Sequence, residues 1–300
     1  MAPELIAAGM VAVGLQLSLQ APVNGELARR TGPLGAALLS FLVGLFLLAA
    51  ILVASGDISR YGNLGGVPAW QLAGGLIGAG YVTAAAWAVG RVGAGAIAAA
   101  TVAGQLSSGI VVDHAGWFGL DPDPVGPFRL LAVPVLVTGA LLVSGDRAGG
   151  TAAGIGRIAP LPILTIFAAG LAVGVQHPLN AELADRVGDL GAAGMNFTTG
   201  TVGLAAVVLA SGGASRLPAA REAPPWAFAG GAIGAITVLA SLAAVEAIGA
   251  SVLAATTIAG ALAGSVLIDR FGVAGVDVRP VDRVRVAGLA LLALGTAAVL

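Results

Sequence analysis

The stretch Gln20-Ala-Pro-Val-Asn-Gly-Glu-Leu-Ala28 returns 156 positions later as Gln176-His-Pro-Leu-Asn-Ala-Glu-Leu-Ala184. The same shift, applied without a gap, aligns identical residues along much of the chain. They include Leu34 with Leu190, Phe41 with Phe197, Gly44 with Gly200, Trp70 with Trp226, Gly78 with Gly234, Thr101 with Thr257 and Asp113 with Asp269. An internal repeat of this kind indicates that a shorter gene was duplicated and fused. The sequence therefore predicts two similar halves, residues 1–146 and 157–300.

Both halves consist mainly of long apolar runs. The chain is 58% hydrophobic and only 10% charged, with a mean hydropathy of +0.98, whereas about a quarter of the residues of a soluble domain carry charge. A helix needs about 20 apolar residues to cross a bilayer. The uncharged runs cover residues 5–25, 34–55, 61–90, 92–112, 130–145, 158–181, 190–215, 223–245, 247–268 and 286–300. We predict an all-α integral membrane protein with ten transmembrane helices, although the short fifth and tenth runs leave nine spans open.

Five helices in each half is an odd number, so the second half must cross the membrane in the direction opposite to the first. Arginine placement tests this prediction, because cytoplasmic loops are enriched in Lys and Arg. The N-terminal face receives Arg60, Arg129 and Arg186, and the opposite face receives Arg29, Arg30, Arg91, Arg147, Arg157, Arg216, Arg221, Arg270, Arg279, Arg283 and Arg285. We therefore expect two inverted five-helix repeats in the cytoplasmic (inner) membrane, with both termini outside the cytoplasm.

The composition also excludes several classes of function. A net charge of −1 without any lysine gives no basic surface for nucleic acid. The absence of cysteine excludes disulfides and thiolate chemistry, and His114 and His177 are the only histidines. The nucleotide-binding pattern Gly-x-x-x-x-Gly-Lys-[Ser/Thr] does not occur. We expect a protein that is not an enzyme and that has no cofactor, no metal and no nucleic-acid partner.

Inverted repeats point to transport, because exchanging the conformations of the two copies opens a central site to the other side of the membrane. The sequence thus favours a secondary transporter that works by alternating access on a small organic solute. Its expected partners are that solute, membrane lipid and a coupling ion, proton or sodium, and the chain is expected to be a monomer or homodimer. A membrane scaffold or assembly subunit is the alternative. An intramembrane enzyme would need a grouping of acid, base and nucleophile that the sequence lacks.

A series of short patterns runs through the first half in a fixed order. They are Gln20-x-x-x-Asn24, Ser40-Phe41-x-x-Gly44, Gly74-Gly-x-x-Gly78, Val92-Gly93-Ala94, Gln105 and Asp113-His-x-Gly116. Together they resemble the YdcZ-like branch of the drug/metabolite transporter superfamily. Five-helix proteins of that family occur singly, as pairs or as fused duplicates, and this chain is similar to the fused form. The resemblance implies an inner-membrane exporter and leaves its substrate unassigned.

Paired amides are the first candidates for a substrate site. Gln20 and Asn24 share a helix face, as do Gln176 and Asn180, and a proline between each pair frees a backbone carbonyl. Such interrupted helices bind solutes in transporters, but the amides could equally bridge neighbouring helices. The other expected substrate-binding residues are Ser40, Asn196, Tyr81, Trp87 and Gln105. Gln105 and Trp87 align with alanines of the second half, so a site that uses them is asymmetric.

Acidic residues are candidates for coupling or gating, because a carboxylate within a membrane is costly. Glu26 and Glu182 each precede an arginine by four residues, Arg30 and Arg186, so interfacial ion pairs are the structural alternative. Glu246 ends a predicted helix without a nearby cation. Asp113 and Asp269 also end helices, where a negative charge opposes the helix dipole. One interpretation is that each pairs with a nearby cation, which is His114 or Arg129 for Asp113 and Arg270 or Arg283 for Asp269. The other is that each acts as a gate.

Two rows of glycine predict close helix packing. Gly74-x-x-x-Gly78 and Gly230-x-x-x-Gly234 let helix backbones approach each other in lipid. Their apolar surroundings do not suit phosphate binding. Gly93, at the start of the next predicted helix, is a candidate hinge.

Overall fold

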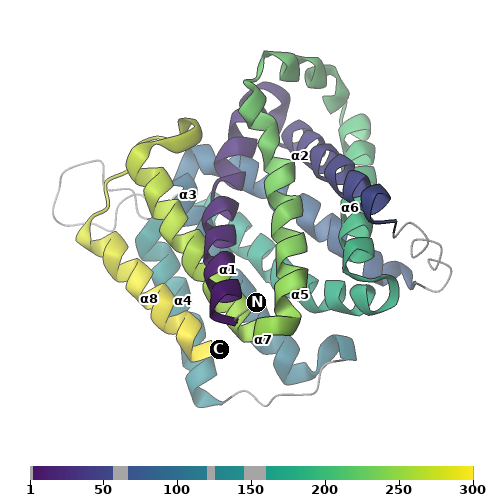
Figure 1. Ribbon diagram of the computed structural model, residues 1–300. Helices are drawn as coiled ribbons and strands as arrows, with labels where there is room; N and C mark the ends of the chain where they lie inside the picture. The colour runs from purple at the N-terminus through teal and green to yellow at the C-terminus, as the bar shows by residue number, and fades with distance from the viewer. Residues whose placement is uncertain (1–2, 57–66, 120–125, 145–159, 300) are drawn as a thin grey trace.

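The computed structural model of the chain describes residues 3–56, 67–119, 126–144 and 160–299. Every regular element in these ranges is helical, and none of them forms a strand, which confirms the all-α prediction (Figure 1). The α-helices are α1 (Pro3–Leu17), α2 (Gln20–Ser55), α3 (Ala73–Ala115), α4 (Pro127–Ser144), α5 (Pro160–Val187), α6 (Asp189–Ala210), α7 (Ala229–Phe271) and α8 (Arg283–Val299). Short 3₁₀ turns are η2 (Ala69–Leu72), η3 (Trp117–Gly119), η4 (Gly213–Glu222), η5 (Pro225–Phe228) and η6 (Val273–Gly275).

Six helical segments among the described residues are long and apolar enough to cross a membrane. They are Pro3–Ser55, Ala69–Val112, Pro160–Val187, Asp189–Ala210, Pro225–Ala244 and Val252–Phe271, and Leu130–Val143 is a shorter apolar helix. The first two, with 53 and 44 residues, are about twice as long as a bilayer requires. The described helices therefore suit a protein that crosses a membrane several times.

Single glycines interrupt the long helical segments. Gly32 in α2 has φ 78° and ψ 162°, and Gly93 in α3 has φ 84° and ψ 168°. Gly188, the second-half equivalent of Gly32, separates α5 from α6 with φ 75° and ψ 163°. Only glycine adopts this conformation without strain, so these three positions fix where the chain changes direction. Gly93 thus lies at a break, as its candidate role as a hinge requires.

Helix contacts recur with the two halves exchanged. Helix α1 packs along α7, and α5 packs along α3. A Cβ atom on Gly14 would lie 3.0 Å from the Cα atom of Gly260, and one on Gly170 would lie 3.2 Å from the Cα atom of Gly104. These two contacts are equivalent under the 156-residue shift. Such an exchange is the mark of an isologous contact, in which two copies meet around an approximate two-fold axis.

The centre of this arrangement is a shared apolar core. Phe41 and Phe197 contact each other, and Leu48, Leu204 and other equivalent pairs pack around them. Backbones approach closely here at Gly75 and Gly231, each one position after the first glycine of a predicted row. The row glycines Gly74, Gly78, Gly230 and Gly234 face amide side chains of the other half instead. A Cβ atom on Gly75 would lie 2.8 Å from the amide nitrogen of Gly200, and one on Gly231 would lie 2.8 Å from that of Gly44. Each glycine therefore admits a helix of the other half at backbone distance.

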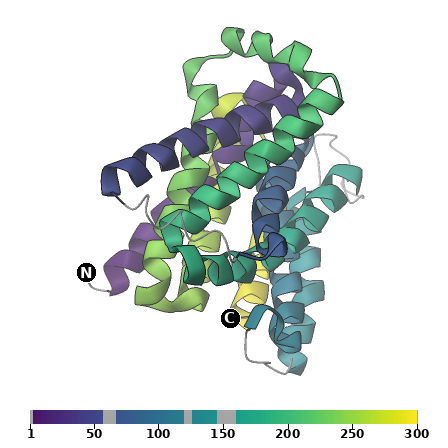
Figure 2. The same cartoon turned by 90° about the vertical axis from the view of Figure 1, so that its right-hand side faces the viewer.

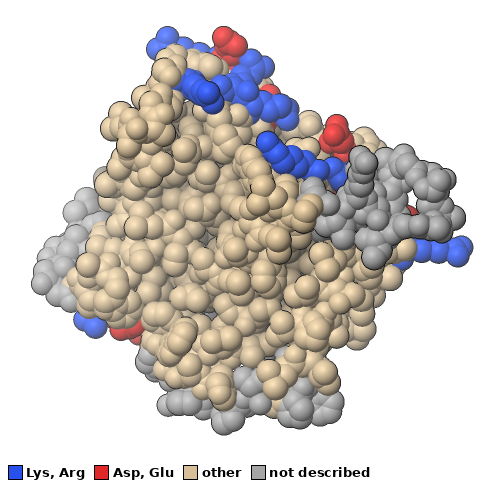
Figure 3. Space-filling view, turned by 180° about the vertical axis from the view of Figure 1, so that it is seen from behind, with Lys and Arg blue, Asp and Glu red and all other residues tan. Residues whose placement is uncertain are grey.

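The charged side chains are unevenly distributed. On the face seen in Figure 3, most of them gather toward the upper end, above a broad surface without charge. Helix η4, with Arg216, Arg221 and Glu222, lies at the upper end in Figure 1. Both chain ends lie in the lower part of the molecule in Figures 1 and 2. The termini and the main group of charges are thus at opposite ends.

Candidate functional site

The paired glutamines join the two halves. The Nε2 atom of Gln20 donates a hydrogen bond of 3.2 Å to the carbonyl oxygen of Gly230, and the Nε2 atom of Gln176 donates one of 2.6 Å to that of Gly74. The two bonds are equivalent under the 156-residue shift. Both are hydrogen bonds across the helix contacts between the halves, which is the bridging alternative that the sequence left open.

Three buried amide oxygens beside these bonds have no hydrogen-bond partner among the described groups. They are the Oδ1 atoms of Asn24, Asn180 and Asn196. Asn24 is 1% exposed. A Cβ atom on Gly230 would lie 2.7 Å from the Cγ atom of Asn24, and one on Gly74 would lie 2.6 Å from the Oδ1 atom of Asn196. The asparagines thus face the glycine rows of the opposite half and leave no room there for a larger side chain.

The remaining predicted residues are dispersed over several contacts. Ser40 is buried on α2, where its neighbour across the interface is Gly231. Gln105 lies at the contact of α3 with α5, opposite Gly174. Tyr81 packs against the apolar core between the halves. The structure therefore brings Gln176, Asn180 and Asn196 together at Gly74, whereas Ser40, Tyr81 and Gln105 lie at separate contacts.

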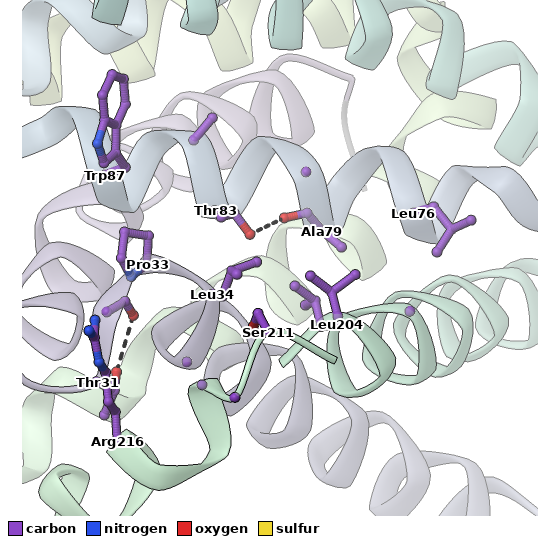
Figure 4. Close-up of a pocket in the computed structure, with 18 of the residues that line it drawn as sticks. Thr31, Pro33, Leu34, Leu76, Ala79, Thr83, Trp87, Leu204, Ser211 and Arg216 are labelled. Carbon is purple, nitrogen blue, oxygen red and sulfur yellow. Dashed lines mark hydrogen bonds between the residues drawn. The ribbon is translucent and has the colours of Figure 1, made fainter. Parts of the chain in front are cut away.

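A groove of about 960 Å³ lies beside the break of α2. Helices α2, α3 and α6, the start of α5 and the turn into η4 line it, so both halves contribute (Figure 4). Its lining is mostly aliphatic. The polar side chains on it are those of Thr31, Thr83, Thr165, Ser211, Ser215 and Arg216. Trp87 is the one member of the expected substrate-binding set that lines this groove.

Arg216 is the charged residue of the groove, which has no acidic side chain in its lining. A Cβ atom on Gly32 would lie 3.7 Å from the Nη1 atom of Arg216, so the guanidinium lies against the break in α2. No ion pair of Arg216 occurs within the described part of the chain. The arginine distribution predicts a cytoplasmic loop for this residue. Its place in the groove depends on the direction of the chain at Gly32, which the repeat alone does not reveal.

Trp87, at the same end of the groove in Figure 4, is held by its neighbour one turn along α3. The guanidinium of Arg91 lies over the indole ring, 4.5 Å from its centroid, and it donates a hydrogen bond to the carbonyl oxygen of Trp87. This cation–π contact fixes the ring at the groove wall.

Asp269 caps a helix of the other half. Its carboxylate, 1% exposed, accepts hydrogen bonds from the amides of Ala94 at 2.8 Å and Gly95 at 3.1 Å, directly after the Gly93 break. Its cation is Arg285, at 3.5 Å. The expected pairing with Arg270 or Arg283 is therefore wrong, because the cation comes from the start of α8. A carboxylate at a helix N-terminus is favourable, which accounts for Asp269 even though its charge opposes the dipole of α7, the helix that carries it.

The other acidic candidates differ from one another. Glu26 forms an ion pair with Arg29 rather than with the expected Arg30, and Arg30 pairs with Glu222 of η4 at 3.2 Å. No ion pair of Glu182 with Arg186 occurs in the described ranges. The side chains of Asp113 and Glu246 lie outside the described ones.

Comparison with known proteins identifies the repeat. The family model described as "Putative inner membrane exporter, YdcZ" matches the chain twice, over residues 5–142 and 161–298. The two matches are offset by the same 156 positions, which confirms the duplication. A solved structure described as "Crystal structure of protein" shares 17% sequence identity with the chain, covers 97% of it and 96% of its own length, and superimposes with a TM-score of 0.54. At that identity it supports a common fold alone. No curated protein matches the chain.

Proposed function

Because the chain belongs to the YdcZ family of inner-membrane exporters, a transport family of the drug/metabolite group, we propose that it is a secondary active transporter. It moves a small organic solute across the cytoplasmic membrane by alternating access. The observation that carries this proposal is the groove of about 960 Å³ between helices of both halves. Its volume is within the range of ligand pockets, about 300–1,000 Å³.

The proposed architecture is ten transmembrane helices in two inverted repeats, residues 1–146 and 157–300. The breaks at Gly32 and Gly93 divide the two longest apolar segments into spans of ordinary length. Five spans per half require a two-fold axis that lies in the membrane plane. The exchanged contacts Gln20–Gly230 and Gln176–Gly74 support that axis. With the charged η4 end in the cytoplasm, both termini lie outside it.

The proposed motion is a rocking of one half against the other. The glycine contacts bring backbone against backbone, so few side chains need to change rotamer when the helices slide. By symmetry, the alternate state closes the groove at Gly32 and opens an equivalent one at Gly188. Asn24, Asn180 and Asn196 are proposed to bind solute in that cycle, since their buried oxygens have no partner here.

The coupling ion is proposed to be a proton or sodium, since the chain has no nucleotide-binding motif. Glu182 is the first candidate to carry it, because Glu26 is engaged by Arg29 and Asp269 by Arg285. Asp113 and Glu246 are the other candidates to carry the coupling ion.

The test uses the absence of native cysteine. Asn24→Cys and Asn180→Cys are labelled singly with a membrane-impermeant maleimide in right-side-out and inside-out vesicles, with and without an imposed proton or sodium gradient. Val202→Cys, on a side chain that is 64% exposed in the apolar part of α6, is the matched control and should stay unlabelled. We expect the accessible side of the two asparagine positions to change with the gradient. Accessibility that is fixed under every condition would overturn alternating access and favour the scaffold.

A further inference from the structure

Arg216, the charged residue of the groove lining, lies at one end of the groove. Figure 4 shows Thr31 and Arg216 together at one end, across from Trp87, whereas Leu76 and Leu204 lie toward the other. Arg216 brings one positive charge, and no acidic side chain lines the groove to neutralise it. Arg216 is exposed to solvent, so its charge attracts an anion from the aqueous side, and the apolar wall beside it adds contact area for an apolar body attached to that anion.

The apolar part of the groove is open at its sides. Leu76 is 53% exposed, and Leu161 and Val207 are also exposed. These side chains belong to helices that lie in the bilayer in the proposed architecture. A ligand with an apolar body could therefore enter from the lipid, while its charged group stays at the level of η4.

The second half gives an internal comparison. The break at Gly188 is followed by Asp189, whereas the equivalent break at Gly32 is followed by Pro33. The second half thus places its own carboxylate at the beginning of the helix after the break. At the first break that negative charge is missing, and Arg216 lies there instead.

From this arrangement we infer that the substrate is an amphipathic monoanion, a small organic carboxylate with a single unbranched or aromatic apolar body, whose carboxylate pairs with Arg216. The inference rests on the proposed transport function and names the substrate class of the same groove. A second negative charge would have to lie among leucines without a partner, at a large desolvation cost. A cationic amphiphile would meet Arg216 as a like charge.

The test measures binding in nanodiscs of phosphatidylcholine. Ser211→Cys, at the groove, reports occupancy by protection from a maleimide. Ser55→Cys, the equivalent first-half position outside the groove lining, is the matched control. The probes are decanoate, decylammonium and decanedioate. We expect decanoate to protect Ser211→Cys but not Ser55→Cys, decylammonium to protect neither, and decanedioate to need at least about tenfold higher concentration, since each 1.4 kcal/mol of lost binding is tenfold.

Substitutions test whether the charge of Arg216, rather than a general change in the fold, determines the binding of decanoate. Arg216→Gln should weaken protection by decanoate about tenfold through loss of a charge-assisted contact. Pro33→Asp should weaken it to a similar extent, because it places a carboxylate beside Arg216, as Asp189 does at the equivalent break of the second half. Arg221→Gln, on the same η4 but outside the groove lining, should leave protection unchanged.

Three results would overturn the inference. They are equal protection by decylammonium, equal effects of Arg216→Gln and Arg221→Gln, and loss of decanoate protection when phosphatidylglycerol is added to the nanodiscs, which would make the occupant an anionic lipid. If decanoate binds as expected but Asn24→Cys and Asn180→Cys keep fixed accessibility, the transport proposal fails and the anion site stands. If accessibility alternates without selectivity for decanoate, only the substrate class fails.

Discussion

Phe41 and Phe197, which are equivalent residues of the two halves, contact each other with ring centroids 5.0 Å apart and planes inclined by 33°. Equivalent residues can meet in this way only where the axis that relates the two copies passes between them. The same axis relates the reciprocal bonds of Gln20 and Gln176. The interface between the halves is therefore built around a pair of aromatic rings.

Phe41→Ala and Phe197→Ala should each destabilise the protein by about 3–5 kcal/mol, because each leaves a cavity in the shared core. Since the rings contact each other, the double variant should lose less than the sum, with a coupling of about 0.5–1.5 kcal/mol. Unfolding in mixed detergent micelles measures these values. Phe46→Ala, at a side chain that is 71% exposed, is the control and should have little effect. Strict additivity of the two core variants would contradict the contact.

Asp269→Asn should destabilise the fold by about 3–5 kcal/mol, because it removes one charge of the buried ion pair between Asp269 and Arg285. Arg270→Gln changes the adjacent but exposed residue and should cost less than about 0.5 kcal/mol. Thermal unfolding followed by size-exclusion chromatography compares the two. Equal effects would mean that the buried pair of Asp269 and Arg285 contributes nothing to stability.

Gly104→Ala should reduce the amount of folded protein, since its Cβ atom would lie 2.8 Å from the amide nitrogen of Leu171 and 2.9 Å from the carbonyl carbon of Gly170. Backbone atoms of α5 cannot move aside cheaply, so overpacking should cost about 1–3 kcal/mol. Gly109→Ala, on the same helix with nothing within 4 Å of the new atom, should be neutral or slightly stabilising. The yield of monodisperse protein from each variant tests this pair.

Orientation in the membrane can be tested with two further single cysteines. Arg221→Cys on η4 should react only with reagent on the cytoplasmic side, and Glu4→Cys on the first turn of α1 only with reagent on the outer side. Both residues are exposed. Labelling of both from the same side would refute the proposed topology.

The sequence predicted what repetition and hydropathy can reveal. The duplication and the all-helical class follow from a fixed offset and from local composition, and the family match and the structure confirm them. The glycine rows mark helix contacts between the halves, but backbones meet at Gly75 and Gly231, and the row glycines face amide side chains. Helix boundaries were less predictable. The run 5–25 is divided because α1 ends at Leu17 and α2 begins at Gln20, and nothing in the hydropathy of the segment marks that interruption.

Ion pairing was the weakest prediction, because sequence spacing gives only neighbours on the same helix. Glu26 has arginines both three and four positions ahead, and a small difference in side-chain direction selects Arg29. Asp269 finds its cation at the start of α8 and its amide donors 175 residues upstream, at Ala94. The groove was missed for the same reason, since Arg216 reaches it only through the tertiary fold.

The cap at Ala94 has a consequence for biosynthesis. The amides that it satisfies are made early, but the aspartate that accepts their hydrogen bonds is translated 175 residues later. When only the first half has left the ribosome, the amides at this helix end therefore have no acceptor from Asp269. They must stay hydrated or in contact with the insertion machinery until α7 has been synthesised. Maturation of the first half is thus completed by the second, and the order of synthesis sets when the bundle can close.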